Sequence, residues 1–360
     1  MARRLLVPSA GSGPSNNLIR SLKAGDPSCR IVGCHDDRFV VRKSLADRNY
    51  LVPPPHKREF ARALCRVIET EKVDLVIPNS EADVTIISDL RERLPCRTFL
   101  PRRAVIRRCQ DKYELTAFLR RAGLPVPLTC RVTNLKGIED LFRRLAPRSP
   151  LWCRIRRGSG SMGAIAVKTP AQARSWIKYW QEMRATPAGS FTLSEYLPGR
   201  DFCVQGVWQD GKLVLAKMHE RLSYYVAGSS PSGVSSTAGL AKMIFEPQLL
   251  AVCANAVRAL DAKACGAFFV DLKENAKGRA CITEINAGRF ANVSAIHDVA
   301  GRQNMALTCV RLALGERVTI RRAGNGEEHY VLRDLDTLPA VFRPGELFDG
   351  IADAREWGNA

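Results

Sequence analysis

The sequence lacks a long apolar segment. No uninterrupted apolar run reaches the ~18 residues that a membrane-spanning helix needs, so no membrane partner is expected. The first residues, MARRLLVPSAG, are basic and then apolar, but the apolar part is too short for a secretory signal and runs straight into a turn of Gly and Ser. We interpret this start as a first strand and expect a cytoplasmic protein.

Paired cysteines are also missing. The twelve cysteines are scattered singly, no C-x-x-C occurs, and Cys29 and Cys34 are the closest two. Without a secretory signal, this usage predicts reduced thiols rather than a disulfide framework. A zinc site is not expected either, because such sites need closely paired ligands.

Acidic and aromatic residues are comparatively few. Fifty-five Lys and Arg face thirty-six Asp and Glu, which gives a net charge of +19, and aromatics make up 7% of the chain. Such a charge fits a polyanionic partner such as nucleic acid or a membrane surface. The basic residues, however, form short runs such as 102–103 and 107–108 and do not alternate with aromatics. We therefore favour a solvated Arg-rich surface with a site for anionic small molecules, and expect no nucleic-acid partner.

Strands and helices alternate in the first hundred residues. Apolar runs and helical periodicity predict elements at 3–8, 16–23, 29–34, 57–72 and 73–78. This alternation predicts an open α/β domain with parallel strands. The G-S-G-P turn after the first strand resembles a dinucleotide fingerprint only weakly, so we interpret it as a structural turn.

A second unit begins near Asp111 and has a different pattern. Two predicted strands, 151–155 and 164–168, flank the loop RRGSGSMG as a hairpin. The remaining predicted elements are helices at 112–122, 170–183 and 247–261 and strands at 191–196, 202–208, 212–219, 266–273 and 279–286. The polar, small-residue stretch 221–239 predicts a mobile loop. The tail after 320 predicts short strands and loops.

The stretch CITEINAGRF carries the strongest chemical pattern. In a strand, Glu284 and Asn286 point to the same face, and the preceding strand carries Asp271 across the turn. Three oxygen ligands on adjacent strands suit Mg²⁺, which takes its other ligands from water and phosphates. Taken alone, the pattern also fits exposed polar residues on an alternating sheet.

Two loops add to this pattern. The glycine-rich loop 156–163 offers backbone N–H groups to phosphates, although a surface hairpin tip fits as well. The stretch EYLPGRDF places Glu195 and Asp201 at its two ends. It can offer backbone hydrogen bonds to a purine and a carboxylate to a ribose, or it can simply be a corner between two strands.

In this order, the pieces resemble the ATP-grasp superfamily over residues 3–315. The resemblance passes through Asp111-Lys112, Arg154, RRGSGSMG, EYLPGRD, KMHER, FFVDLK and TEINAGRF. Carbamoyl-phosphate synthetase large-subunit modules, biotin carboxylase and carboxylate–amine ligases are the most similar members. The resemblance implies an α/β fold, with an open parallel pre-ATP-grasp domain followed by a two-lobed grasp module. The implied domains are 1–110, the small lobe 111–190, the large lobe 191–320 and a C-terminal extension 321–360.

The resemblance also implies ATP with Mg²⁺, or with Mn²⁺ in its place. Lys112 and Arg154 would bind phosphates, and Arg289 would stabilise the acyl-phosphate and its tetrahedral adduct. The loop over the triphosphate would comprise Gly158, Ser159, Gly160, Ser161, Met162 and Gly163. The adenine hinge and the rest of the nucleotide pocket would be Glu195, Tyr196, Leu197, Asp201 and His219. The metal ligands would be Asp271, Glu284 and Asn286.

The chain departs from the family pattern at several of these positions. The frequent Glu-x-Asn-Pro-Arg is here Glu-x-Asn-Ala-Gly-Arg, one residue longer, which leaves the aim of Arg289 open. Asp271 stands where Glu or Gln is usual, Asp201 where Glu is usual, and Arg154 where most relatives have Lys. His219 fits an ordinary strand histidine about as well as a nucleotide contact. No required chemical group is lost.

We therefore expect an ATP-dependent ligase that activates a small-molecule carboxylate as an acyl-phosphate and transfers it to an amine, releasing ADP and phosphate. The alternatives are a bicarbonate-activating carboxylase or carbamoyl-phosphate synthetase-like enzyme, and a non-catalytic ATP-binding regulatory protein. Relatives are commonly dimers, so a homodimer is the oligomer that the resemblance suggests. The identities of the carboxylate and the amine stay open.

Overall fold

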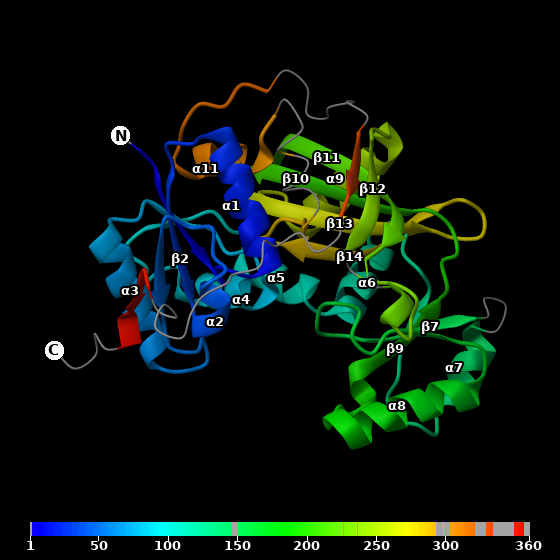
Figure 1. Cartoon of the computed structure of the whole chain (residues 1–360). Helices are drawn as coiled ribbons and strands as arrows, with labels where there is room; N and C mark the ends of the chain where they lie inside the picture. The colour runs from blue at the N-terminus through cyan, green and yellow to red at the C-terminus, as the bar shows by residue number, and fades with distance from the viewer. Residues whose placement is uncertain are drawn as a thin grey trace.

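The structure is a computed structural model, and the residues that it describes form three β-sheets with helices packed around them (Figure 1). It describes residues 2–145, 150–225, 227–235, 237–292, 298, 303–320, 329–333 and 349–355. The predicted mixed α/β class is confirmed. Among the helices in these ranges, none is both long and apolar enough to cross a bilayer.

The first sheet is six-stranded and wholly parallel, as the βαβ pattern predicts. Its strand order is β16 (Ile351–Asp353), β3 (Arg48–Leu51), β2 (Arg30–His35), β1 (Arg4–Pro8), β4 (Leu75–Val76) and β5 (Arg97–Thr98). The helices of this region are α1 (Gly13–Gly25), α2 (Arg38–Val41), α3 (Glu59–Glu71), α4 (Glu81–Leu90) and α5 (Arg103–Cys109). The predicted strand 73–78 is only two residues long, and the sequence analysis missed the short β3, β5, α2, α4 and α5.

Close packing explains why the turn after β1 contains a glycine. Gly11 has φ +90°, and a Cβ there would lie 1.9 Å from the carbonyl oxygen of Val40. Ser12 then caps α1 by accepting a hydrogen bond from the N–H of Ser15, with Pro14 in the first turn. Residues Leu5 to Val7 of β1 are fully buried, as expected for a parallel strand covered on both faces.

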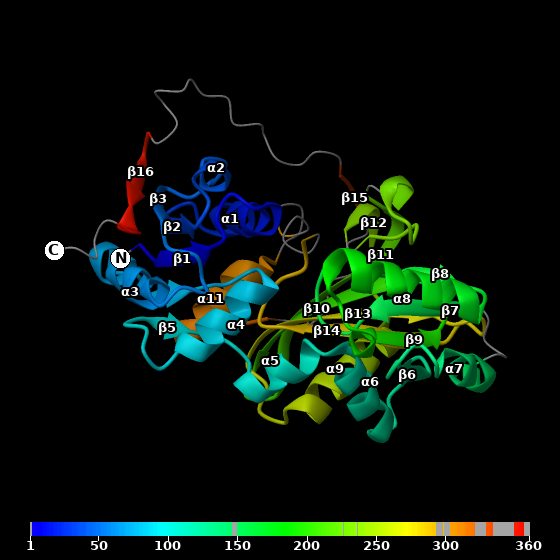
Figure 2. The same ribbon diagram turned by 90° about the horizontal axis from the view of Figure 1, so that it is seen from below.

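The small sheet is antiparallel and four-stranded. Its order is β6 (Thr129–Arg131), β9 (Phe191–Glu195), β7 (Leu151–Ile155) and β8 (Ile165–Val167). Helices α7 (Ile138–Leu145) and α8 (Pro170–Arg184) share its apolar core. The predicted hairpin with the RRGSGSMG tip is confirmed, because β7 and β8 pair through Cys153 and Ile165. Figure 2 shows this lobe lying beside the large sheet, with α6 (Lys112–Arg121) close to both.

The large sheet is antiparallel and six-stranded. Its order is β14 (Ala280–Ala287), β13 (Gly266–Glu274), β10 (Asp201–Gln209), β11 (Lys212–Tyr224), β12 (Ala238–Ile244) and β15 (Tyr330–Leu332). The helix α9 (Pro247–Leu260) packs on one face through the core that contains Phe202 and Phe268. The helix α11 (Met305–Ala313) packs against α1 and joins the large sheet to the first domain. Part of the opposite face packs against α11 through Val207, Leu215 and Ala267, and another part of that face lines a cavity.

The predicted mobile loop 221–239 is wrong at both ends. β11 continues to Tyr224 and β12 begins at Ala238, so that Arg221 pairs with Ala241 and Tyr224 with Ala238. A short 3-10 turn, Ala227–Ser229, lies between them, and positions 226 and 236 lie outside the described residues. Register shifts on both sides of Ser223 interrupt the period-two alternation that sequence analysis depends on.

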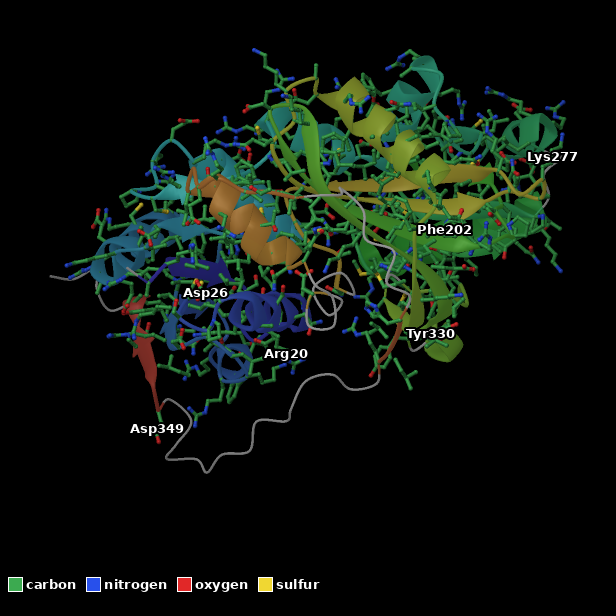
Figure 3. The ribbon with its side chains drawn as sticks, turned by 90° about the horizontal axis from the view of Figure 1, so that it is seen from above. Arg20, Asp26, Phe202, Lys277, Tyr330 and Asp349 are labelled. Carbon is green, nitrogen blue, oxygen red and sulfur yellow. The ribbon has the colours of Figure 1, made fainter. Side chains whose placement is uncertain are left out.

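The C-terminal tail contributes one strand to each of the two six-stranded sheets. β15 pairs with β12 of the large sheet, whereas β16 pairs with β3 of the first sheet. Figure 3 shows Tyr330 and Asp349 lying apart, and Arg42 donates a hydrogen bond to the carbonyl oxygen of Asp349 at 2.5 Å. The predicted short strands of the tail are present, and the boundaries of the four predicted domains stay predictions.

Candidate active site

A cavity of about 390 Å³ lies where the small sheet, the large sheet and the first domain meet. Trp152 and Arg154 reach it from the small sheet, Asp271 and Glu284 from the large sheet, and Glu81 from the start of α4. All the residues predicted for nucleotide, metal and catalysis line it, apart from Gly163. The structure therefore brings together predicted site residues that are up to 177 positions apart in the chain, from Lys112 to Arg289.

The three predicted metal ligands come together as the alternation predicts. β13 and β14 are antiparallel, with Asp271 directly opposite Glu284, and Asn286 lies two residues further along the same strand. A register shift follows Asp271, where Thr283 donates a side-chain hydrogen bond to the carbonyl oxygen of Asp271 at 3.0 Å. This bulge fixes the backbone at the point where the two carboxylates meet.

Lys112 is held in place by the start of its helix. Asp111 caps α6 by accepting hydrogen bonds from the N–H groups of Tyr113 and Glu114, and it also pairs with Arg156 at 2.7 Å. The ammonium of Lys112 donates to the carbonyl oxygen of Gly158 at 2.6 Å and lies 3.7 Å from Glu284. One cation thus contacts both the glycine loop and a predicted metal ligand.

Arg154 is the second predicted phosphate cation, and it is 9% exposed. One terminal nitrogen donates to the carbonyl oxygen of Thr283 at 2.9 Å, while Nε has no partner among the described residues. Burial lowers the pKa of Arg154, but guanidinium titrates so far above neutrality that the side chain stays charged. A buried charged donor without a partner, in a cavity wall, suits an anionic ligand such as phosphate.

The two facing carboxylates have opposite pKa shifts. Burial alone would raise the pKa of Glu284, but the charges of Lys112 and Arg154 outweigh it and lower that pKa. Burial raises the pKa of Asp271, and the neighbouring guanidinium of Arg221 only partly offsets this effect. Glu284 is therefore ionised over the whole neutral range, and Asp271 is the more easily protonated of the two.

The residues present fit a hard divalent cation. Two carboxylates and one amide oxygen converge, which is the donor set that Mg²⁺ and Mn²⁺ accept. Oδ1 of Asp271 accepts from Arg221, but Oδ2 accepts no hydrogen bond among the described residues. The amide oxygen of Asn286 accepts one hydrogen bond from Arg289, which leaves its second lone pair for a metal ion. Within the described ranges, no three His, Cys, Asp or Glu side chains form a cluster that could hold a metal.

The extra residue before Arg289 does not remove it from the cavity. Gly288 has φ +90°, and a Cβ there would approach Val84 to 2.9 Å, so the turn after β14 requires glycine. Arg289 folds back to hydrogen-bond Asn286 and lies over the ring of Phe269 at 4.8 Å. The longer Asn-Ala-Gly-Arg spacing is thus absorbed by one left-handed glycine.

The predicted adenine hinge lies at the end of β9. Leu128 and Glu195 exchange hydrogen bonds, at 2.9 Å through the backbone and at 3.3 Å through the Glu195 carboxylate. The rings of Tyr196 and Trp152 are 6.2 Å apart, and Leu197 is buried. An apolar wall of this kind, with a backbone edge beside it, suits a flat base. His219 is 1% exposed on β11 and lines the same cavity.

Both carboxylate oxygens of Asp201 accept hydrogen bonds from the protein, and its predicted contact with the ribose stays a prediction. Its Oδ1 accepts from Arg221 at 2.5 Å, and its Oδ2 accepts from the hydroxyl of Tyr224 at 2.6 Å. Lys273 also lies 3.7 Å from Oδ2. The carboxylate is therefore engaged by the protein, and the groups that it holds become part of the cavity wall.

The glycine loop has free space beside two of its glycines. A Cβ added at Gly158 or at Gly160 would meet nothing within 4 Å, and Met162 is 62% exposed. Gly163 does not line the cavity; its carbonyl oxygen accepts from Trp176, and a Cβ would lie 2.5 Å from Ile155. These contacts hold the end of the loop, and the role of Gly163 in phosphate binding stays a prediction.

Arg221, Tyr224 and Lys273 are among the cavity residues that the sequence analysis missed. Arg221 lies two residues after His219 on β11, and Lys273 lies two residues after Asp271 on β13. The alternation that groups Glu284 with Asn286 would have placed both on the cavity face. Tyr224 follows the register shifts around Ser223, so no period-two argument could have found it.

The chain matches no protein-family model. Among curated proteins, it is 26% identical over 226 residues to a probable alpha-L-glutamate ligase of Coxiella burnetii, covering 61% of this chain and 70% of that protein. These similarities in sequence are modest, so the comparison of folds carries more weight.

Solved structures match over most of the chain. A biotin carboxylase of Campylobacter jejuni, crystallised as a β,γ-ATP complex, has a TM-score of 0.69 at 13% identity, covering 89% of this chain and 73% of that one. An L-amino acid ligase of Bacillus licheniformis has a TM-score of 0.65 at 13% identity, covering 87% and 74%. The N5-carboxyaminoimidazole ribonucleotide synthetase of Thermus thermophilus has a TM-score of 0.64 at 16% identity, covering 91% and 82%. The resemblance predicted from the sequence is confirmed, and the chain has the ATP-grasp fold.

Proposed function

We propose that this protein is an ATP-dependent ligase that joins a carboxylate to an amine and releases ADP and phosphate. The observation that carries the proposal is the meeting of Lys112, Arg154 and Glu284 in one cavity of an ATP-grasp fold. The probable glutamate ligase and the L-amino acid ligase among the similar proteins support C–N bond formation as the reaction class.

The residues have separable roles in this reaction. Lys112 and the unpartnered Nε of Arg154 bind the phosphates as fixed positive charges. A divalent cation held by Asp271, Glu284 and Asn286 would neutralise phosphate charge when bound. The hinge at Glu195, Tyr196 and Leu197 binds the base, with His219 beside it.

The chemistry then needs two transfers. An oxygen of the substrate carboxylate attacks the γ-phosphorus, the bond to ADP breaks, and an acyl-phosphate forms. The nitrogen of the amine attacks the acyl carbon, loses a proton, and inorganic phosphate leaves. Arg289, on the cavity wall beside Asn286, stabilises the oxyanion of the tetrahedral adduct. The loop 158–162 covers the site, because the anhydride would hydrolyse in open water.

The test is phosphate release from Mg-ATP against a panel of carboxylates, with hydroxylamine present to trap the acyl group. One acid should stimulate release and yield its hydroxamate. Glu284→Gln should lower this activity by at least about 100-fold, because it removes a charge that acts on the reacting phosphate. Glu274→Gln is the matched control, since Glu274 lies on the same sheet but pairs with Arg200 and does not line the cavity.

A second candidate function has support of its own. The biotin carboxylase and the carboxyaminoimidazole ribonucleotide synthetase among the similar structures favour bicarbonate as the activated acid. Turnover with bicarbonate alone, and with no organic acid, would select this candidate. Binding of ATP without turnover on any acid would contradict both and favour the regulatory alternative. The homodimer and the cytoplasmic location stay predictions.

A further inference from the structure

Arg221 occupies the junction between the nucleotide end and the metal end of the cavity. It lies on β11 directly opposite Asp201 on β10, and its guanidinium reaches diagonally to Asp271 on β13. Each carboxylate accepts one hydrogen bond from it at 2.5 Å. The side chain of Arg221 is 9% exposed, so this bridge is shielded from solvent.

The two carboxylates that Arg221 bridges differ in how many of their oxygens accept hydrogen bonds from the protein. Asp201 has its second oxygen held by Tyr224 at 2.6 Å, and Tyr224 in turn accepts from Lys273 at 3.0 Å. Asp271 has only one oxygen engaged, and Oδ2 accepts nothing among the described residues. Asp201 therefore anchors the guanidinium, and the guanidinium sets the rotation of the shorter Asp271 side chain.

The bridge also sets the charge of the metal end. Arg221 pairs with Asp271 at 2.5 Å, and a guanidinium is charged throughout the neutral range. Lys112 lies 3.7 Å from Glu284, the other carboxylate of the predicted metal set. Every carboxylate of the predicted metal set thus already faces a protein cation, which weakens the attraction for a free divalent ion.

We propose that Arg221 is a positioning residue that directs one oxygen of Asp271 into the metal site and, through its charge, disfavours divalent-ion binding until nucleotide phosphates are present. The inference rests on the proposed function for the meaning of the metal site. Its two halves, hydrogen-bond geometry and charge, can be separated by substitution.

The experiment measures the affinity of the whole chain for Mn²⁺ alone, without nucleotide, from the electron paramagnetic resonance signal of free Mn²⁺. Arg221→Met should raise this affinity about tenfold, because a full positive charge next to Asp271 is lost. Arg221→Lys should stay within about twofold of the wild type, because the charge is kept. Arg200→Met is the matched control, since Arg200 precedes Asp201 and pairs with Glu246 and Glu274 but does not line the cavity.

The geometric half has its own measurement. Lysine cannot bridge two carboxylates as a guanidinium fork does, so Asp271 loses its fixed orientation in Arg221→Lys. Water can compensate for this in the affinity for Mn²⁺ alone, but ATP turnover needs the ion aligned with the phosphates and should fall at least about tenfold. Unchanged Mn²⁺ affinity in Arg221→Met would contradict the claim that the charge of Arg221 disfavours metal binding. Full turnover in Arg221→Lys would contradict the claim that its hydrogen bonds orient Asp271. If Arg221→Met does not fold, Arg221→Gln replaces it with the same expected rise in affinity. If no acid supports turnover in any variant, the Mn²⁺ result still decides the charge half, and only the proposed function fails.

Discussion

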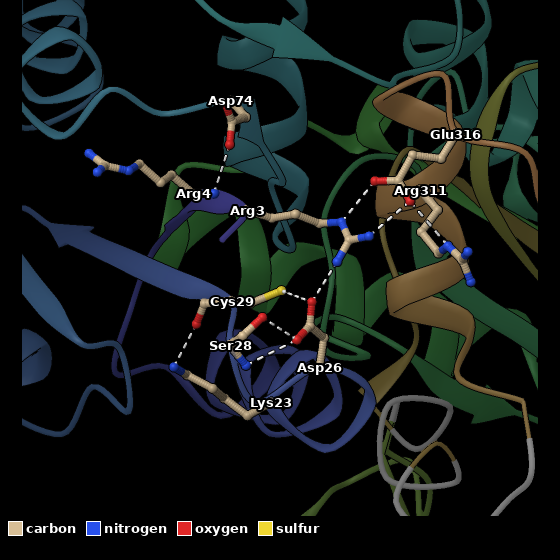
Figure 4. Close-up of polar contacts among 9 residues, drawn as sticks. All are labelled: Arg3, Arg4, Lys23, Asp26, Ser28, Cys29, Asp74, Arg311 and Glu316. Atoms are coloured by element: carbon tan, nitrogen blue, oxygen red, sulfur yellow. Dashed lines mark hydrogen bonds and ion pairs between the residues drawn. The ribbon is translucent and has the colours of Figure 1, made fainter. Parts of the chain in front are cut away.

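Two arginines in this molecule make the same kind of bridge in different surroundings. Arg3, which precedes β1, pairs with Asp26 at 2.5 Å and with Glu316 at 2.8 Å, and so links the start of this strand to the residues that follow α1 and α11 (Figure 4). Arg221 joins Asp201 and Asp271 inside the cavity, both at 2.5 Å. The side chain of Arg3 is 26% exposed and that of Arg221 is 9% exposed.

The surroundings decide what the bridge does to its acids. The hydrogen bond from Arg3 lowers the pKa of Glu316, and the hydrogen bond from Ser28 lowers the pKa of Asp26. At the cavity, burial outweighs Arg221 and raises the pKa of Asp271. Where water reaches the ion pairs, as at Arg3, the acids stay ionised at little cost. Where water is excluded, as at Arg221, the desolvation of the charges opposes their attraction.

The largest expected difference is in the cost of removing the guanidinium. Arg221→Met leaves two shielded carboxylates without their cation, and should reduce the free energy of unfolding by about 3 kcal/mol or more. Arg3→Met exposes acids that water can solvate, and should cost about 1 kcal/mol or less. Thermal unfolding midpoints of both variants measure this. Equal losses would mean that burial does not distinguish the two bridges.

The next difference is in pH dependence. Because the folded-state pKa of Glu316 is depressed, its contribution to stability is full above the unfolded pKa near ~4.3 and is lost as the pH falls through the folded pKa. The wild type should therefore lose stability on acidification below that point more steeply than Glu316→Gln. Asp271, with a raised pKa, has the opposite sign. Unfolding midpoints measured from pH ~6 down to pH ~3 test this, and parallel curves would contradict it.

The smallest expected difference is in salt dependence. Screening acts on partly exposed pairs, so raising NaCl from about 0.05 M to about 1 M should remove a few tenths of a kcal/mol of the Arg3 contribution. The shielded bridge at Arg221 should change less. Midpoints of the wild type, Arg3→Met and Arg221→Lys at the two salt concentrations give the comparison. A larger salt response at Arg221 would show that solvent ions reach the cavity.

Much of the fold could be predicted because several elements have a clear period. β7 agrees with its prediction residue for residue, since Leu151–Ile155 is a short run bounded by Pro150 and a Gly/Ser loop. The short parallel strands β3 and β5 carry too few residues for any periodicity, and pairing with neighbouring strands is what forms them. The extension of β11 was hidden for a different reason, because two register shifts interrupt its alternation.

The sequence predicted which strands carry the candidate site and which of their side chains share a face. It did not predict which side chains pair with one another across the sheet. Glu284 and Asn286 share a face because they are two residues apart, and that is local information. Arg221 meets Asp201 because of the register between β10 and β11, and it meets Asp271 because β10 lies between β11 and β13. The order and register of the strands depend on contacts between residues far apart in the chain, and these contacts are difficult to predict from a single sequence.

The hydrogen bond from Lys112 to the carbonyl oxygen of Gly158 has a consequence for ligand exchange. The ammonium has three N–H donors, so a phosphate oxygen can bind beside the carbonyl oxygen of Gly158 or take its place. If Lys112 binds phosphate as proposed, the arrival of the nucleotide is coupled to the position of the glycine loop, because both would bind the same ammonium group.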